Sequence, residues 1–275
     1  MNKRIEGKIK KIYEIVFNKV FKEVKKQKAE TNKQEISNII LKIEKSKKYK
    51  KFAKEFSIEL AKMGLNTQKG IWKEFYKVAK EKGYIALPKT YTEYQERIFK
   101  KAILHNFRMI TSIPKEVKDV YKYKYITTLM AQVEEGSIGR KSFEKVLRKS
   151  GATKAKLIAR TETAKLQTAI SENRSTDLGS ICYQWLSSND KRTRPSHKEM
   201  NKVIVFWRKD SEKPLLDDMR GNAGEFPNCR CAPQPIFDER DLTENNYKVY
   251  DYRIDRVITM TKQQLVNCIK NKQII

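Results

Sequence analysis

Apolar residues recur every three or four positions at the start of the chain, with lysine and glutamate between them. The first stripe comprises Ile5, Ile9, Ile12, Val16, Val20 and Val24. Because an α-helix turns once in 3.6 residues, this spacing places all six side chains on one face. Similar stripes begin at Ile36, Phe52, Trp72, Tyr94 and Val117, whereas strand-like alternation is scarce. The sequence therefore predicts a mostly helical region over 1–150, with helix ends near Gly64, Gly83 and Pro114.

Positive charge is concentrated in the same region. The chain has 60 Lys and Arg against 33 Asp and Glu, a formal net charge of +27. Residues 1–150 hold 38 basic and 17 acidic side chains, and the remainder holds 22 and 16. Such a field attracts polyanions, so double-stranded DNA is the first candidate partner, bound through phosphates without base reading. A solvated lysine-rich helical surface with no DNA role explains the charge as well.

Several classes of protein are disfavoured by the sequence. No run of about 18 apolar residues occurs, so we expect no transmembrane helix and no membrane partner. The first residues lead into mixed charged sequence instead of an apolar signal core, which argues against secretion. Cys182, Cys229, Cys231 and Cys268 are too few and too unevenly spaced for a disulfide framework. We expect synthesis in a reducing cytoplasm.

Four short motifs follow one another between residues 135 and 237. Ala159–Ala164 reads Ala-Arg-Thr-Glu-Thr-Ala, inside a helix predicted over about 153–178. Cys182–Leu186 has strand character and includes Trp185. Asp190–Met200 then reads Asp-Lys-Arg-Thr-Arg-Pro-Ser-His-Lys-Glu-Met, and Phe226–Cys231 reads Phe-Pro-Asn-Cys-Arg-Cys.

In this order and spacing the four motifs resemble the minor head proteins of tailed phages, the Mu F-like head-morphogenesis family. The sequence departs from the family pattern in three respects. Arg194 and His197 stand where many members carry Cys, Phe226 precedes Pro227 where many have His, and Asn201-Lys202 replaces a Gly after the Ser-His helix.

The resemblance implies a structural minor head (capsid) protein without enzymatic turnover. Such a protein would act in head morphogenesis at the portal vertex, where DNA is packaged and ejected. Its implied partners are the portal protein and, as further candidates, the scaffold or major capsid protein. Its implied location is the virion, in the capsid interior, after assembly in the host cytoplasm. Two rival classes are a head-carried effector enzyme and a free-standing, non-specific DNA-binding protein.

The motif residues are predicted to maintain the fold, and no catalytic residue is assigned. They are Arg160, Thr161, Glu162, Trp185, Asp190, Arg192, Arg194, Ser196, His197, Asn228, Cys229, Arg230 and Cys231. We expect Arg160 to hydrogen-bond to the turn that contains Asp190, and Glu162 to cap that turn or pair with Arg192 or Arg194. The enzymatic alternative would use Arg and Glu as in ADP-ribosyltransferases, or Glu162, Asp190 and His197 as a nuclease site.

The Cys229-x-Cys231 pair could hold a structural zinc ion, the one cofactor that the sequence suggests. Both thiols can reach one metal, with His197 as the third ligand and Cys182 or Asp190 as the fourth. The alternative is that both thiols are buried, small hydrophobic groups in the last turn. Cys268 lies in a Lys-Asn-rich tail and looks incidental.

The predicted fold class is α+β: an elongated, mainly helical region over 1–150, a small compact α+β domain over 151–240 and an extension over 241–275. Trp185, Phe206 and Trp207 are expected to anchor the core of the small domain. Leu215–Gly221 is expected to be a loop or a turn-rich excursion. The extension should begin strand-like through Tyr247, Tyr250 and Tyr252, and end amphipathic through Val257, Leu265 and Ile269.

Overall fold

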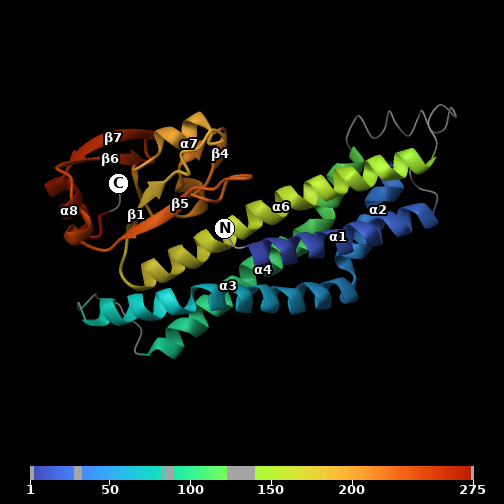
Figure 1. The fold of residues 1–275 in the computed structure, drawn as a ribbon, viewed down its shortest axis with the longest axis horizontal. Helices are drawn as coiled ribbons and strands as arrows, with labels where there is room; N and C mark the ends of the chain where they lie inside the picture. The colour runs from blue at the N-terminus through green and yellow to red at the C-terminus, as the bar shows by residue number, and fades with distance from the viewer. Residues whose placement is uncertain (1–2, 28–32, 82, 84–89, 123–139, 274–275) are drawn as a thin grey trace. The chain divides into compact units, whose positions relative to one another are not determined.

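The computed structural model describes residues 3–27, 33–81, 83, 90–122 and 140–273 of the chain (Figure 1). The chain divides into two compact units. The helical unit comprises Asn2–Met63 and Ile103–Thr163, and the sheet unit comprises Gly64–Ala102 and Ala164–Ile275. The α+β class is confirmed, with helices first and a small mixed sheet after them.

The long helices carry the apolar stripes of the sequence. They are α1 (Lys3–Lys26), α2 (Lys33–Lys45), α3 (Lys47–Glu81), α4 (Tyr91–Lys122) and α6 (Arg140–Asp177). The predicted end near Gly64 is wrong, because α3 continues through this residue to Glu81. Without a Cβ, Gly64 leaves room for the side chains of Leu166 and Ile170 on α6, which all belong to the sheet unit. The end predicted near Gly83 lies close to the observed one.

The predicted end at Pro114 is also wrong, since α4 runs through this proline to Lys122. Pro114 has no N–H, so the carbonyl oxygen of Ile110, four residues earlier, loses its helical donor. The buried hydroxyl of Tyr49, from α3, donates a hydrogen bond to that oxygen instead. A tertiary contact thus compensates for the local helix-breaking residue.

The core of the helical unit is rich in aromatic residues. All six residues of the α1 stripe are buried, together with Tyr13, Phe17 and Phe21. The Phe17 ring stacks on Tyr13, Phe21 and Tyr121, with centroid separations of 6.5, 6.2 and 6.4 Å. On α6, Gly151 lies so close to Phe17 that a Cβ there would be 2.8 Å from the ring. The aromatic side chains of α1 therefore pack inside the helical unit.

A five-stranded sheet in the order β5-β1-β2-β6-β7 forms the centre of the sheet unit. Its strands are β1 (Cys182–Leu186), β2 (Ile204–Phe206), β5 (Ala232–Ile236), β6 (Asn246–Asp251) and β7 (Arg256–Thr261). Neighbouring strands are antiparallel except β2 and β6, which are parallel. Pro233 and Pro235 lie in β5, at an edge of the sheet, where missing backbone donors are tolerated.

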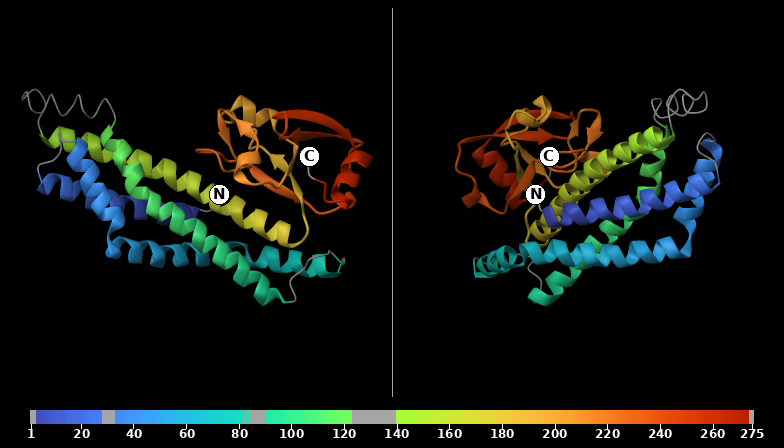
Figure 2. Two further views of the ribbon diagram at one scale, coloured as in Figure 1. Left: turned by 180° about the vertical axis from the view of Figure 1, so that it is seen from behind. Right: turned by 45° about the vertical axis from the view of Figure 1, so that its right-hand side comes forward.

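Alternating residues of the strands enter two separate cores. In β1, Cys182 belongs to one core and Trp185 to the other, and in β2 Phe206 and Val205 divide in the same way. The helix α8 (Lys262–Lys270) lies beside β6 and β7 (Figure 2) and contributes Leu265 to the Cys182 core. The segment 223–231 contributes to the Trp185 core. Trp185, Phe206 and Trp207 are buried as predicted.

The predicted boundaries at 150 and 240 are not those of the structure. Residue 150 falls inside α6, and 241–275 is no extension, because β6 and β7 complete the sheet. Leu215–Gly221, predicted as a loop or a turn-rich excursion, forms a short hairpin of β3 (Leu215–Leu216) and β4 (Met219–Arg220). Cys268 is not incidental, since it is buried in the same core as Cys182. None of the described helices has the length and apolarity to cross a membrane.

Candidate metal centre

The Asp190 motif and the Asn-Cys-Arg-Cys motif contact each other in the sheet unit. Arg230, from the Asn-Cys-Arg-Cys motif, donates two hydrogen bonds to the carboxylate of Asp190, with 2.6 Å from Nη2 to Oδ1. The same carboxylate accepts from the backbone N–H of Arg192 at 2.9 Å. Hydrogen bonds from Arg230, above all, hold the pKa of Asp190 well below its usual range. This two-pronged pair fixes the turn of the Asp190 motif against the Cys-x-Cys segment.

A second link is made by Arg194, which donates from Nη2 to the carbonyl oxygen of Pro227 at 3.0 Å. Asn228 follows with φ +57°, a left-handed conformation that Asn tolerates better than most residues. After α7 (Pro195–Glu199), Lys202 has φ +66° and occupies the turn where the family pattern places Gly. The side chain of Asn201 accepts from the backbone N–H of Ser187 at 3.0 Å, which ties this turn to the end of β1.

His197 projects from α7 into the core of the unit and is 3% exposed. Its ring meets the rings of Trp185 and Phe226 edge-on, at centroid distances of 5.7 and 4.9 Å. Pro195 is the first residue of α7, where a fixed φ favours helix initiation. The two aromatic contacts restrict rotation of the imidazole.

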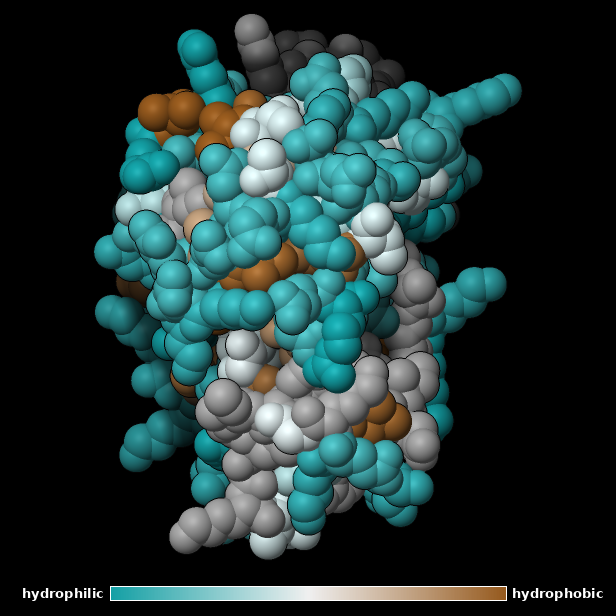
Figure 3. Space-filling view, turned by 90° about the vertical axis from the view of Figure 1, so that its left-hand side faces the viewer, coloured by the Kyte–Doolittle hydropathy of each residue, from teal (hydrophilic) through white to brown (hydrophobic). Residues whose placement is uncertain are grey.

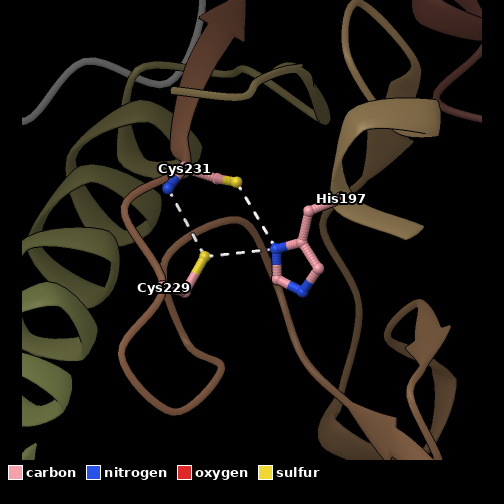
Figure 4. A group of neighbouring side chains, drawn as sticks. All are labelled: His197, Cys229 and Cys231. Carbon is pink, nitrogen blue, oxygen red and sulfur yellow. Dashed lines mark hydrogen bonds between the residues drawn. The ribbon is translucent and has the colours of Figure 1, made fainter. Parts of the chain in front are cut away.

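Cys229 and Cys231 face one nitrogen of this imidazole (Figure 4). His197 Nδ1 lies 3.4 Å from Sγ of Cys229 and 3.5 Å from Sγ of Cys231. The three potential ligand atoms lie within 4.8 Å of one another, and all three residues are buried. The backbone N–H of Cys231 points to Sγ of Cys229 at 3.4 Å.

The cluster favours one thiolate. Hydrogen bonding with the side chain of Cys231, and then with His197 and the backbone N–H of Cys231, lowers the pKa of Cys229. The pKa of Cys231 is raised, because its proton is shared with Cys229 and its side chain is desolvated. A thiolate is the form of cysteine that binds metals.

Asp217 is the member of the site that sequence reasoning missed. It lies in the turn between β3 and β4 with φ +51°, and its Oδ2 is 3.8 Å from Nε2 of His197. Its Oδ1 accepts a hydrogen bond from Ser196 Oγ at 2.8 Å, and its Oδ2 lies 3.4 Å from Nη1 of Arg194. No local pattern distinguishes Asp217 from Asp218 beside it, so only the fold identifies this residue.

Neither predicted fourth ligand fits. Cys182 lies in the other core, on the opposite face of β1, and Asp190 is bound by Arg230. A cavity of about 80 Å³ adjoins the cluster and is lined by Ser188, Thr193 and Pro227 among others. The residues present thus supply three ligands and a small polar space.

Arg160 and Glu162 do not have the predicted partners. Arg160 Nε donates to Glu6 Oε1 at 3.3 Å, within the helical unit. Glu162 Oε2 lies 3.9 Å from His105 Nε2, and Thr161 is buried. The predicted bond from Arg160 to the Asp190 turn is therefore wrong, because both groups are engaged elsewhere. Their spacing on α6 directs Arg160 towards α1 and Glu162 towards α4.

The comparisons with known proteins agree with the motifs. Residues 123–233 match the family model described as "Phage Mu protein F like protein". An uncharacterized protein of Haemophilus influenzae (strain ATCC 51907 / DSM 11121 / KW20 / Rd) is 28% identical over 134 residues, which cover 48% of this chain. The aligned part spans 29% of that relative's length, and no solved structure matches significantly. The predicted resemblance to the Mu F-like family is confirmed over residues 123–233, the range that the family model matches.

Proposed function

We propose that this chain is a structural minor head protein of a tailed phage or prophage, which acts in head morphogenesis. The observation that carries the proposal is the family match over 123–233. We further propose that the protein is placed at the portal vertex, in the capsid interior, with the portal protein as its main partner. The scaffold and major capsid proteins are further candidate partners.

The ion pairs around the motifs suit a structural role. In the sheet unit, the Asp190–Arg230 pair and the contacts of Arg194 hold turns that the family motifs supply. In the helical unit, Arg160 and Glu162 join α6 to other helices. These contacts use the polar groups of the motifs to hold chain segments together. They support fold maintenance as the role of the motif residues.

We propose a DNA contact through the lysine cluster of the helical unit. The lysine cluster comprises Lys42, Lys45, Lys47, Lys48, Lys50, Lys51 and Lys54, all exposed. Within this stretch the one acidic residue is Glu44, whose carboxylate lies 3.7 Å from Nζ of Lys115. Exposed lysines that far outnumber the neighbouring acidic residues attract phosphates irrespective of base sequence.

One face of the molecule also favours polar partners. On the face shown in Figure 3, hydrophilic residues predominate and hydrophobic ones form small, separate patches. Binding through such a face depends on charge and hydrogen bonds more than on a broad apolar contact. Portal binding and DNA binding must therefore be separated by their dependence on salt.

The portal proposal is tested by co-expression with the portal protein of the same genome. The tagged chain is recovered at about 0.15 M and about 0.5 M salt, and its partners are identified by mass spectrometry. We expect a portal complex of fixed stoichiometry at both salt concentrations. Recovery of nucleic acid alone, lost at the higher salt concentration, would contradict portal binding and favour a free-standing DNA-binding protein.

The DNA proposal is tested with the double variant Lys47→Glu and Lys48→Glu. We expect weaker binding of duplex DNA and a slope of log affinity against log salt that is smaller by about 2. The matched control, Lys248→Glu with Lys272→Glu, makes the same charge change on exposed residues of the sheet unit. Equal loss of affinity in both variants would show a response to net charge and contradict a contact at the lysine cluster.

A further inference from the structure

We propose that His197, Cys229 and Cys231 bind one zinc ion, through Nδ1 and the two sulfur atoms, with a water molecule as the fourth ligand. This site goes beyond the proposed role in the head, because it concerns how the sheet unit is held together. It would join α7 to the Cys-x-Cys segment. The turn before α7 is also linked to this segment, by the ion pair between Asp190 and Arg230.

The separations of the ligand atoms fit a tetrahedral metal site. Zinc lies about 2.3 Å from thiolate sulfur and about 2.0–2.1 Å from imidazole nitrogen, so a tetrahedral angle places sulfur and nitrogen about 3.5–3.6 Å apart. The observed separations are 3.4 Å for Cys229 and 3.5 Å for Cys231. Both sulfur-to-nitrogen distances are already close to the tetrahedral value, so zinc binding needs little movement of these atoms.

Hydrogen bonding alone explains this cluster less well. An imidazole nitrogen makes one good hydrogen bond, as donor or as acceptor, yet two sulfur atoms converge on Nδ1 of His197 (Figure 4). A metal ion satisfies all three groups at once. Two sulfurs and one imidazole also form a donor set that favours zinc over magnesium or calcium.

The surroundings of His197 match those of metal-binding histidines. Such histidines commonly direct the second ring nitrogen to a carboxylate, which fixes the tautomer and the ring orientation. Nε2 of His197 is buried, has no hydrogen-bond partner within the described parts of the chain, and lies 3.8 Å from Oδ2 of Asp217. Ser196 Oγ donates to Asp217 Oδ1 at 2.8 Å and holds this carboxylate in place. A proton on Nε2 would leave the Nδ1 lone pair for the metal.

The cavity beside the cluster supplies the fourth position. Its volume of about 80 Å³ exceeds what one water molecule needs, and hydroxyl groups of Ser188 and Thr193 line it. With two thiolates and a neutral imidazole, the zinc site would carry no net charge. A neutral site is compatible with the burial of His197, Cys229 and Cys231.

The test is the metal content of the full chain, purified under reducing conditions without a polyhistidine tag. We expect one zinc per chain by elemental mass spectrometry after dialysis, falling towards none in Cys229→Ala and in Cys231→Ala. Cys268→Ala is the matched control, because it removes a buried cysteine from the other core and should keep the metal. Cobalt in place of zinc should give sulfur-to-metal charge-transfer absorption, which Cys231→Ala should weaken.

Asp217→Asn gives a second readout that does not depend on losing a ligand. It keeps the three ligands and should weaken zinc affinity about 10- to 100-fold in a chelator competition. Zinc is also added to the reduced, zinc-free wild-type chain. Failure of that chain to bind zinc would overturn the proposal. An intramolecular Cys229–Cys231 disulfide in the protein as isolated, or unchanged zinc in the folded double variant Cys229→Ala and Cys231→Ala, would also overturn it.

Discussion

The helical unit and the sheet unit are stabilised by different kinds of contact. In the helical unit, side chains repeated along regular helices form an aromatic core around Phe17. Pairs such as Lys8–Glu59 and Arg160–Glu6 join its helices at the edge of that core. In the sheet unit, turns bring together groups that lie far apart in the sequence, and two cores occupy opposite faces of the sheet.

Backbone conformation shows the difference most clearly. All residues with positive φ within the described ranges lie in the sheet unit, and two of them, Asp217 and Asn228, border the candidate metal centre. Regular helices tolerate exchange of one apolar residue for another of similar size. A turn with positive φ depends on the residue that adopts it. The comparison therefore predicts that single substitutions act through backbone geometry in the sheet unit and through packing in the helical unit.

The largest effect is expected for Gly224→Ala in the sheet unit. Gly224 has φ +94°, and a Cβ there would lie 2.5 Å from Thr168 Oγ1 and 3.1 Å from the carbonyl oxygen of Cys231. Strain and overpacking together should lower the free energy of unfolding by about 3 kcal/mol or more. Urea unfolding followed by tryptophan fluorescence measures this loss.

Gly83→Ala is the matched control for Gly224→Ala. Gly83 has φ +68°, but no atom of the described, non-adjacent residues lies within 4 Å of an added Cβ. This change should cost only the strain of the left-handed conformation, about 1 kcal/mol. Equal losses for the two variants would mean that the close approach at Gly224 contributes nothing.

The next effect depends on pH and concerns Glu172 of α6. Burial is the main cause that raises its pKa from 4.5 to about 7; Glu225 and Asp210 add to the rise, while Lys213 and Lys101 oppose it. Between these pH values the folded chain holds the proton more firmly than the unfolded chain, so stability from this group is lost as pH rises towards 7. Between pH 4 and pH 8, the free energy of unfolding of the wild type should fall by about 2–3 kcal/mol relative to that of Glu172→Gln.

Urea unfolding at several pH values measures this difference. A constant difference between Glu172→Gln and wild type across the range would show that the carboxyl group titrates alike in both states. A difference that changes in the opposite direction would show that Lys213, which donates to Glu225 at 3.0 Å, dominates the environment of Glu172.

A smaller effect is expected in the helical unit from Gly151→Ala. The added Cβ would meet the Phe17 ring at 2.8 Å, so the aromatic stack must shift. Overpacking should cost about 1–3 kcal/mol, partly offset by the higher helix propensity of alanine. Gly7→Ala, on α1 with open space around the added group, should instead be neutral or stabilising by up to about 1 kcal/mol.

Hydrogen exchange of the full chain, measured for Gly151→Ala and Gly7→Ala, tests whether the helical unit responds separately from the sheet unit. Lost protection in Gly151→Ala should centre on α1 and on the part of α6 before residue 164, because Phe17 and Gly151 both lie in the helical unit. Equal loss in β1 and β2 would show that the two units unfold together and would break the comparison.

The smallest effect is expected for Tyr49→Phe. The change leaves the carbonyl oxygen of Ile110 without the donor that replaces the missing N–H of Pro114, at a cost of about 1–2 kcal/mol. Tyr13→Phe is the control, since the buried Tyr13 hydroxyl has no hydrogen-bond partner among the described residues. A thermal-unfolding comparison in which Tyr13→Phe costs as much as Tyr49→Phe would contradict this role. In the background of Pro114→Ala, Tyr49→Phe should cost less, because a backbone donor is restored.

Much of the helical unit follows from the sequence, because helical periodicity is a local property. The α1 stripe from Ile5 to Val24 is buried as predicted. Errors arose where a tertiary contact overrides a local signal, as Tyr49 does at Pro114. The partners of Arg160 and Glu162 could not be inferred, since Glu6 and His105 lie on helices whose register against α6 depends on packing.

For the candidate metal centre, the residue types of the three candidate ligands and the family resemblance could be read from the sequence. The Cys-x-Cys spacing and His197 are visible in the motifs, and all three residues lie within 123–233, the range that matches the family model. Their placement required the folded chain, in which Nδ1 faces both sulfur atoms, Cys182 lies on the other face of β1, and Asp217 Oδ2 lies 3.8 Å from Nε2. Local sequence could not give these contacts, because a strand directs alternate side chains to opposite faces and turns with positive φ decide which distant groups meet.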